Sequence, residues 1–149
     1  MVENSKNYHA PMHTAEHILN QTMVRMFDIE RSFSNHIERQ KSKCDYHFNR
    51  ALTETETASI NQKVNEIISR HFDVNEAYIN RKDAETQYKM DKLPEDAGDT
   101  LRIVKVGDYD TCLCSGIHVE NTSEIGIFKI STTSFEAGVL RIRYKLINL

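Results

Sequence analysis

The sequence has few cysteines and no long apolar run, and both absences exclude classes of protein. Cys44, Cys112 and Cys114 are its three cysteines, an odd and sparse set unlike the dense, even pairing of a disulfide scaffold. They are expected to be thiols or metal ligands in a reducing compartment. No segment approaches the roughly 20 apolar residues that cross a bilayer. The polar residues 1–8 also lack the apolar segment of a secretory signal, so a cytoplasmic protein is predicted.

The sequence also lacks an excess of positive charge, and it contains no internal repeat. Its formal net charge of −3 argues against a protein that coats nucleic acid by bulk electrostatics, but leaves room for a local basic stripe. With 149 residues, 39% hydrophobic and 28% charged, the chain has the size and composition of a globular domain with a buried core. We therefore expect a single domain over residues 1–149.

Two segments have the period of a helix with one buried face. Residues 12–27 carry apolar or small side chains at helical spacing. Residues 54–71 follow a capping-box pattern, in which Thr53 precedes Glu56 by three positions. The inner side of this second helix is expected to carry Ile60, Val64, Ile67 and Ile68. A weaker helical pattern covers residues 83–90 and leads into a polar loop through Pro94 and Gly98.

The remaining segments have the character of strands. Polar and apolar residues alternate over residues 43–48, which predicts a half-buried hairpin with residues 32–37. A turn at Gly107-Asp108 separates two short strands, and Ala137-Gly138 joins two β-rich runs into a C-terminal antiparallel hairpin. The later strand candidates are residues 74–80, 101–106, 109–113, 125–134 and 139–147.

The order of these elements predicts the fold class. A helix, two strands, a second helix and then several strands form segregated layers. The sequence therefore predicts an α+β fold, a two-layer sandwich of helices on a mainly antiparallel sheet.

Two pairs of metal-binding residues with the same spacing lie about a hundred residues apart. The first is His13-Thr14-Ala15-Glu16-His17, and the second is Cys114-Ser115-Gly116-Ile117-His118. On a helix, residues four apart project from one face, so the two histidines of the first pair can bind one ion. Imidazole and thiolate ligands suit zinc, which binds about four ligands in a tetrahedron. The sequence predicts a zinc site formed by His13, His17, Cys114 and His118.

With both pairs placed, the chain resembles the editing domain shared by alanyl- and threonyl-tRNA synthetases, and most of all the free-standing AlaX-type alanyl-tRNA editing proteins. The segments that carry the resemblance are HTAEHIL at 13–19, CSGIHV at 114–119, IGIFKI at 125–130 and GVLRI at 138–142. The resemblance implies zinc at the four matching positions, a two-layer α+β fold, and hydrolysis of the ester that joins a wrong amino acid to tRNA. It also implies trans-editing, because 149 residues leave no room for an activation domain.

The chain departs from the family pattern at the second pair. The alanyl family usually has CGGTH there, whereas Ser115 and Ile117 replace a glycine and a threonine and make the turn bulkier and less polar. The substrate implied by the resemblance is alanine tRNA that carries serine or glycine. The family's Gly-Ser segment is not evident at residues 32–35, so no specificity residue is assigned there.

Ester hydrolysis fits a metal centre of this kind. An aminoacyl ester is already activated, so it needs a positioned water and a cation that stabilises charge on the carbonyl oxygen. Zinc can do both if one coordination position is open, so a zinc-bound water is the candidate catalytic group and no catalytic side chain is assigned. Four protein ligands would close the site. The alternative is then a non-catalytic, zinc-containing module that binds tRNA or a protein, or a metal that orients the substrate's amino group.

Glu16 raises a further hypothesis, because His13-x-x-Glu16-His17 matches the H-x-x-E-H pattern of inverted zinc proteases. Those enzymes need a distant carboxylate ligand and a larger scaffold, so we disfavour a protease. Glu16 is instead expected to be a solvent-facing residue in the first helical turn. Cys112, two residues before Cys114 on an extended strand, is expected to be a small buried residue rather than a substitute ligand.

Positive charges line one side of the last strand. Arg141, Arg143 and Lys145 alternate with apolar residues, so the strand should bury one face and present three cations on the other. Such a stripe could hold the phosphates of tRNA, and solvated residues of an edge strand explain it equally well. Lys41, Lys43 and Arg50 are candidates to extend the surface.

Overall fold

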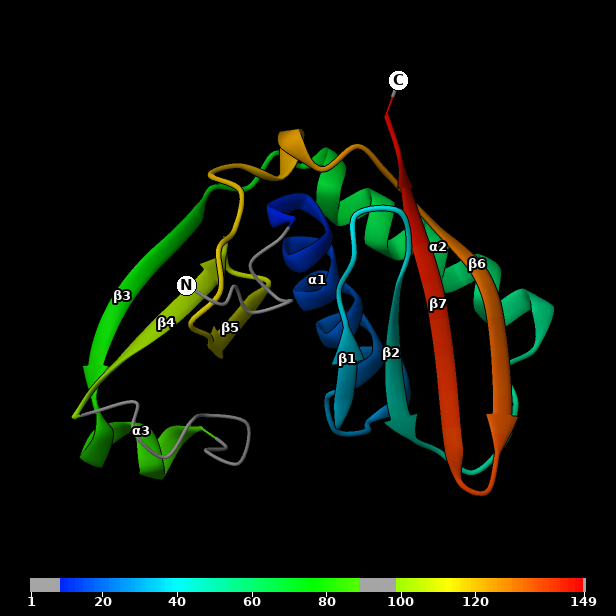
Figure 1. Cartoon of the computed structure of the whole chain (residues 1–149), viewed down its shortest axis with the longest axis horizontal. Helices are drawn as coiled ribbons and strands as arrows, with labels where there is room; N and C mark the ends of the chain where they lie inside the picture. Colours follow the sequence, from blue (N-terminus) through cyan, green and yellow to red (C-terminus); the bar gives the residue numbers. More distant parts are fainter. Residues whose placement is uncertain (1–8, 89–98, 149) are drawn as a thin grey trace.

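A computed structural model describes residues 9–88 and 99–148, in which α1 lies between two antiparallel sheets (Figure 1). The elements are α1 (Ala10–Phe27), β1 (Ser34–His36), β2 (Ser42–His47), α2 (Glu54–Ser69), β3 (Val74–Asn80), α3 (Arg81–Gln87), β4 (Thr100–Val106), β5 (Asp110–Leu113), η2 (Thr122–Glu124), β6 (Ile127–Glu136) and β7 (Val139–Ile147). The predicted loop through Pro94 and Gly98 and the last residues of the predicted 83–90 helix lie outside the described residues.

Helix α1 carries the first ligand pair and is buried on all sides near its start. It begins at Ala10, two residues before the predicted start, because the His9 side chain accepts a hydrogen bond from the Met12 backbone N–H and Pro11 occupies the first turn. Residues 12–20 are all buried, since sheets cover both sides of the helix (Figure 1). None of the helices in the described ranges has the length and apolar composition needed to cross a membrane.

The first sheet has four strands, in the order β1-β2-β7-β6, and forms the main layer under the helices. Its inner face buries Leu140, Ile142 and Tyr144 of β7, which belong to one core with α1 and α2. The predicted inner residues of α2 are all buried there: Ile60, Val64, Ile67 and Ile68. The predicted α+β class is confirmed, and so are the hairpin of β1 with β2 and that of β6 with β7.

The second sheet has three strands, in the order β3-β4-β5, and packs on the other side of α1. The sequence predicted one sheet, but the strands divide into two. Strands β3, β4 and β5 pair with their neighbours in sequence, whereas β2 pairs with β7 from the far end of the chain. Strand β5 ends at Leu113, so the next residue is Cys114 at the junction between the second sheet and α1.

Helix α2 also covers the outer edge of the first sheet. Its predicted capping box is present, with Thr53 and Glu56 each bonded to the other's backbone N–H. Asn65 both donates to the Phe128 carbonyl and accepts from its N–H, at 2.8 Å each, while Asn61 accepts from the Ile130 N–H at 2.9 Å. These side chains take the place of a neighbouring strand along β6, which would otherwise present unpaired backbone groups.

Replacing Asn65 with alanine is therefore expected to lower the free energy of unfolding by about 1–3 kcal/mol, because the Phe128 N–H and carbonyl lose their partners. Urea denaturation followed by circular dichroism measures the change. Gln62→Ala, an exposed position on the same helix, is the matched control and should stay within about 0.5 kcal/mol of the wild type. Equal stability of both variants would contradict this role for Asn65.

Candidate metal centre

The structure brings the two predicted ligand pairs together at the junction of α1 and the second sheet. His13 and His17 project from the N-terminal part of α1, while Cys114 and His118 lie on the segment that follows β5. One ligand atom from each of the four side chains lies within 4.8 Å of the others. Both histidines of α1 are buried, and Cys114 and His118 are partly exposed, so the 114–118 turn is the side of the cluster nearest to solvent.

The imidazole rings pack closely around the thiol. His13 stacks on His118 with ring centroids 4.1 Å apart, and His17 meets His118 edge-on at 4.4 Å. The His13 Nε2 atom lies 3.3 Å from the Cys114 Sγ atom. This arrangement gathers three nitrogen ligands and one sulfur ligand around a single point, which is a donor set that suits zinc.

The Nδ1 atom of each histidine faces a partner outside the cluster. His13 Nδ1 lies 3.0 Å from the Ile117 carbonyl oxygen, and His118 Nδ1 lies 2.9 Å from the Thr14 hydroxyl. His17 Nδ1 is 3.5 Å from an Asp110 carboxylate oxygen. Partners of this kind fix the ring orientation and leave Nε2 for a metal. The His118 Nε2 atom is buried and has no hydrogen-bond partner within the described residues.

Asp110 connects the cluster to the core. Its side chain is fully buried and accepts hydrogen bonds from Arg31 at 2.6 Å and from Gln21 at 2.9 Å. Burial alone would raise the pKa of the Asp110 carboxyl, but the interaction with His17 and the charge of Arg31 outweigh it and hold the pKa well below its usual range. Asp110 therefore carries a negative charge behind His17. No sequence pattern indicated this residue, because the contact depends on β5 meeting α1.

Arg102 on β4 holds the 114–118 turn in place. Its guanidinium donates to the Cys114 carbonyl at 2.9 Å and to the Gly116 carbonyl, and it pairs with Glu76 at 3.2 Å. Ser115 is exposed, and 48% of Ile117 is exposed. Neither of the two residues that depart from the family pattern belongs to the four-residue group, and Ile117 contributes its backbone carbonyl to His13.

The cluster favours positive charge at its centre. Burial alone would raise the pKa of the Cys114 thiol, but the adjacent side chains of His118, His13 and His17 lower it to about 2. Burial lowers the pKa of His118 to about 4. Burial also opposes protonation of His17, yet Asp110 and Cys114 raise its pKa well above the ordinary value. Cys114 is therefore a thiolate, the form that binds metals.

Two predictions about neighbouring residues need correction. Glu16 does not face solvent: only 5% of the residue is exposed, and its carboxylate accepts a hydrogen bond from Asn20 at 2.7 Å and lies 3.7 Å from His13 Nε2. Its place in the first helical turn predicted an exposed position, but Asn20, which donates to Glu16, also accepts from the Ser32 N–H, so the segment before β1 packs beside this part of α1. Cys112 is only partly buried and is not in the four-residue group; burial raises the pKa of its thiol.

The basic stripe on β7 lies on the face opposite the buried residues, as expected, but not on an edge strand. Apolar residues of β7 face the helices, so Arg141, Arg143 and Lys145 lie on the opposite face of the sheet, away from the cluster. The explanation as edge residues is wrong, because β7 lies between β2 and β6. Arg141 forms a bidentate ion pair with Asp45, at 2.8 and 2.9 Å. Lys43 lies opposite Arg143 and extends the surface.

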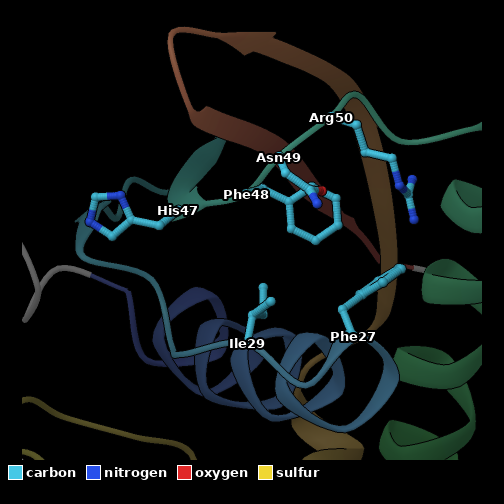
Figure 2. A pocket seen from close by; sticks show the side chains of 6 residues that line it. All are labelled: Phe27, Ile29, His47, Phe48, Asn49 and Arg50. Carbon is cyan, nitrogen blue, oxygen red and sulfur yellow. The ribbon is translucent and has the colours of Figure 1, made fainter.

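Arg50 was another candidate for this basic surface, but it does not lie on it. It pairs with Glu56 at 2.7 Å and lines a hollow with Phe27, Ile29, His47, Phe48 and Asn49. Figure 2 shows this hollow beside the C-terminal end of α1. His17 is ten residues before Phe27 on the same helix, so the hollow is about 15 Å from the cluster along the axis. Lys41 is exposed between β1 and β2.

Comparison with known proteins adds a resemblance to these observations. Residues 101–143 match the family described as the threonyl and alanyl tRNA synthetase second additional domain. The matched segment includes Cys114, His118 and most of the C-terminal hairpin. The predicted resemblance to these synthetases is thereby supported by a segment that carries half of the cluster.

Three relatives share the resemblance over most of the chain. The alanine–tRNA ligase of Fervidobacterium nodosum is 36% identical over 132 residues, which cover 87% of this chain. Those of Exiguobacterium sibiricum and Methanococcus maripaludis are 35% and 33% identical, over 87% and 89% of it. The chain spans about 15% of the length of each of these enzymes. The resemblance to alanyl-tRNA synthetase is confirmed.

The Asp45–Arg141 pair gives a pH dependence that can be measured. Hydrogen bonding to Arg141 lowers the pKa of the Asp45 carboxyl in the folded chain. The unfolded chain then binds the proton more tightly, so the pair stabilises the fold above the unfolded pKa of about 3.9 and loses this effect as pH falls through the folded value. Asp45→Asn is thus expected to destabilise the fold at pH 7 and progressively less at acid pH.

Urea denaturation of the wild type and Asp45→Asn between pH 7 and pH 3 measures this difference. Asp108→Asn, which changes an exposed carboxylate in the turn between β4 and β5, is the control for the charge change. A loss of stability in Asp45→Asn that stays constant over the whole pH range would contradict the assignment.

Proposed function

We propose that this chain is a zinc-dependent deacylase that removes serine or glycine from mischarged alanine tRNA by hydrolysing the aminoacyl ester. The convergence of His13, His17, Cys114 and His118 within 4.8 Å is the observation that carries the proposal. The similarity to alanine–tRNA ligases over 87% or more of the chain supports the choice of substrate. Because charged tRNA is made and used where translation occurs, the proposal includes a cytoplasmic location and action in trans.

The cluster fits zinc in its chemistry and in its surroundings. Its donors are three imidazoles and a thiolate; a hydrogen-bond partner on Nδ1 orients His13 and His118, and His17 Nδ1 faces the Asp110 carboxylate. The buried, unpartnered Nε2 of His118 is an atom that a bound cation would satisfy. A zinc ion held by these residues would act as a Lewis acid toward the ester carbonyl, provided that one coordination position stays open to the substrate.

The chain's own residues have defined parts in this proposal. Asp110 holds His17, and Thr14 holds His118, so that both rings keep one orientation. Arg102 fixes the turn that carries Cys114. The buried carboxylate of Glu16, 3.7 Å from His13, adds negative charge beside the cluster and would attract the ammonium group of an aminoacyl ester.

The rival is a non-catalytic module that keeps zinc for stability and binds tRNA or a protein. A set of four protein ligands favours it, because a closed tetrahedral site leaves no position for substrate. The partial exposure of Cys114 and His118 favours the deacylase, since one side of the cluster can be reached from outside.

We also propose that the outer face of the four-stranded sheet contacts tRNA phosphates. Lys43 lies opposite Arg143, and Lys129 lies opposite Lys145, so these four cations share the face on which Arg141 pairs with Asp45. The cluster is on the other side of α1 from this face. The cations would therefore hold the body of a tRNA rather than its aminoacylated end.

Purified chain is expected to bind about one zinc ion and to release serine from seryl-tRNA for alanine. Cys114→Ser and His13→Ala should each lower zinc affinity and the rate of release by more than about 100-fold, because they remove ligands. Metal analysis and release of labelled serine, glycine or alanine are the measurements, and circular dichroism checks that the variants fold.

His36→Ala removes an exposed histidine outside the cluster and should leave zinc content and release unchanged. A chain that binds zinc but releases no amino acid would favour the non-catalytic module. Full release by both ligand variants would contradict a role of the metal in the reaction.

A double variant, Arg143→Glu with Lys145→Glu, is expected to weaken tRNA binding and to reduce its salt dependence by about two phosphate contacts. Filter binding at several salt concentrations measures both. Lys105→Glu reverses one charge, half the change of the double variant, at an exposed position of the other sheet and serves as the control. An equal effect of that control would show bulk repulsion and would exclude a specific face.

A further inference from the structure

Tyr78 is an aromatic residue that belongs to neither the hydrophobic core nor the four-residue cluster. It lies on β3, and 68% of the residue is exposed, the largest exposure of any large apolar side chain within the described residues. A tyrosine held in a sheet and open to solvent presents its ring in a fixed position. Aromatic residues of this kind form stacking surfaces for nucleobases.

The register of the second sheet places Tyr78 in one row with Cys114. Tyr78 lies directly opposite Arg102, and the Cys114 N–H donates to the Arg102 carbonyl at 3.1 Å, which continues the pairing of β4 with β5. Residues directly opposite on neighbouring antiparallel strands point to the same face. With strands about 4.8 Å apart, the Tyr78 and Cys114 Cα atoms are separated by about 10 Å.

This face is covered at one end and open at the other. Near β5 it is covered by the 114–118 turn, which Arg102 binds through two carbonyls. At β3 it is open, because Glu76 and Tyr78 are both exposed; Figure 1 shows β3 at the outer side of the sheet, with β5 nearest α1. Arg102 also pairs with Glu76, so the spacing between the turn and β3 is fixed by hydrogen bonds.

The proposed substrate has a matching layout. The amino acid is esterified to the ribose of the last nucleotide of the tRNA, so a single sugar separates the ester from the terminal base. With the ester at the cluster, the base lies within the distance that separates Tyr78 from Cys114. Building on the proposed function, we propose that Tyr78 stacks on the terminal nucleobase and thereby positions the ester at the cluster.

The test uses an RNA hairpin with an unpaired 3′ tail whose last base is the fluorescent analogue 2-aminopurine. Stacking on Tyr78 of the zinc-loaded chain should quench its fluorescence. Tyr78→Ala should abolish the quenching and weaken binding by roughly 5- to 100-fold, while Tyr78→Phe should retain both because the ring remains. Zinc content should be the same in all three proteins, since Tyr78 is not in the cluster.

Phe33→Ala is the matched control, because Phe33 is 41% exposed and lies in the loop before β1, outside the second sheet. It should keep the quenching. Wild-type quenching that persists in Tyr78→Ala, or that is lost only in Phe33→Ala, would overturn the inference, and so would failure of the wild type to bind the RNA. The proposed function fails separately, if mischarged tRNA is not hydrolysed while the Tyr78-dependent quenching is observed.

Discussion

The burial of α1 between two sheets is the constraint on which the rest of the structure depends. One side of the helix packs into the core of the four-stranded sheet, and its N-terminal half meets the segment that follows β5. The Thr14 hydroxyl joins the two, because it contacts His118 Nδ1 at 2.9 Å and accepts from the Val119 N–H at 3.2 Å. A helix fixed on both sides cannot rotate, so His13 and His17 keep facing the 114–118 turn.

This burial explains the electrostatic character of the centre. Asp110 and the Cys114 thiolate are negative charges held in or beside the core, and Glu16 is a buried carboxyl next to them. Buried charges are costly unless positive groups balance them. Arg31 does so on the outer side of Asp110, and the raised pKa of His17 has the same cause on the inner side. A cation at the cluster would be stabilised by the same charges.

The two sheets divide the surface into parts with different chemistry. The second sheet is small and open at β3, and its inner face leads directly to the cluster through Arg102 and Cys114. The first sheet is large and presents lysine and arginine side chains on a face that α1 and the cluster do not reach. An RNA that used both would have to reach around the molecule, with its end at the second sheet and its helical body against the first. The order of strands, rather than any single residue, creates this separation.

The sequence by itself determined the local elements and the spacing of the ligands. Periodicity placed the long helices and most strands within a few residues, and β3 at its observed bounds, because each pattern depends on neighbours along the chain. The four-residue spacing of His13 and His17 follows from helix geometry alone. Only the tertiary structure decided that the strands form two sheets, that β7 is a central strand, that Glu16 is buried, and that Asp110 lies behind His17. These features depend on contacts between segments about a hundred residues apart, which packing selects and local periodicity does not encode.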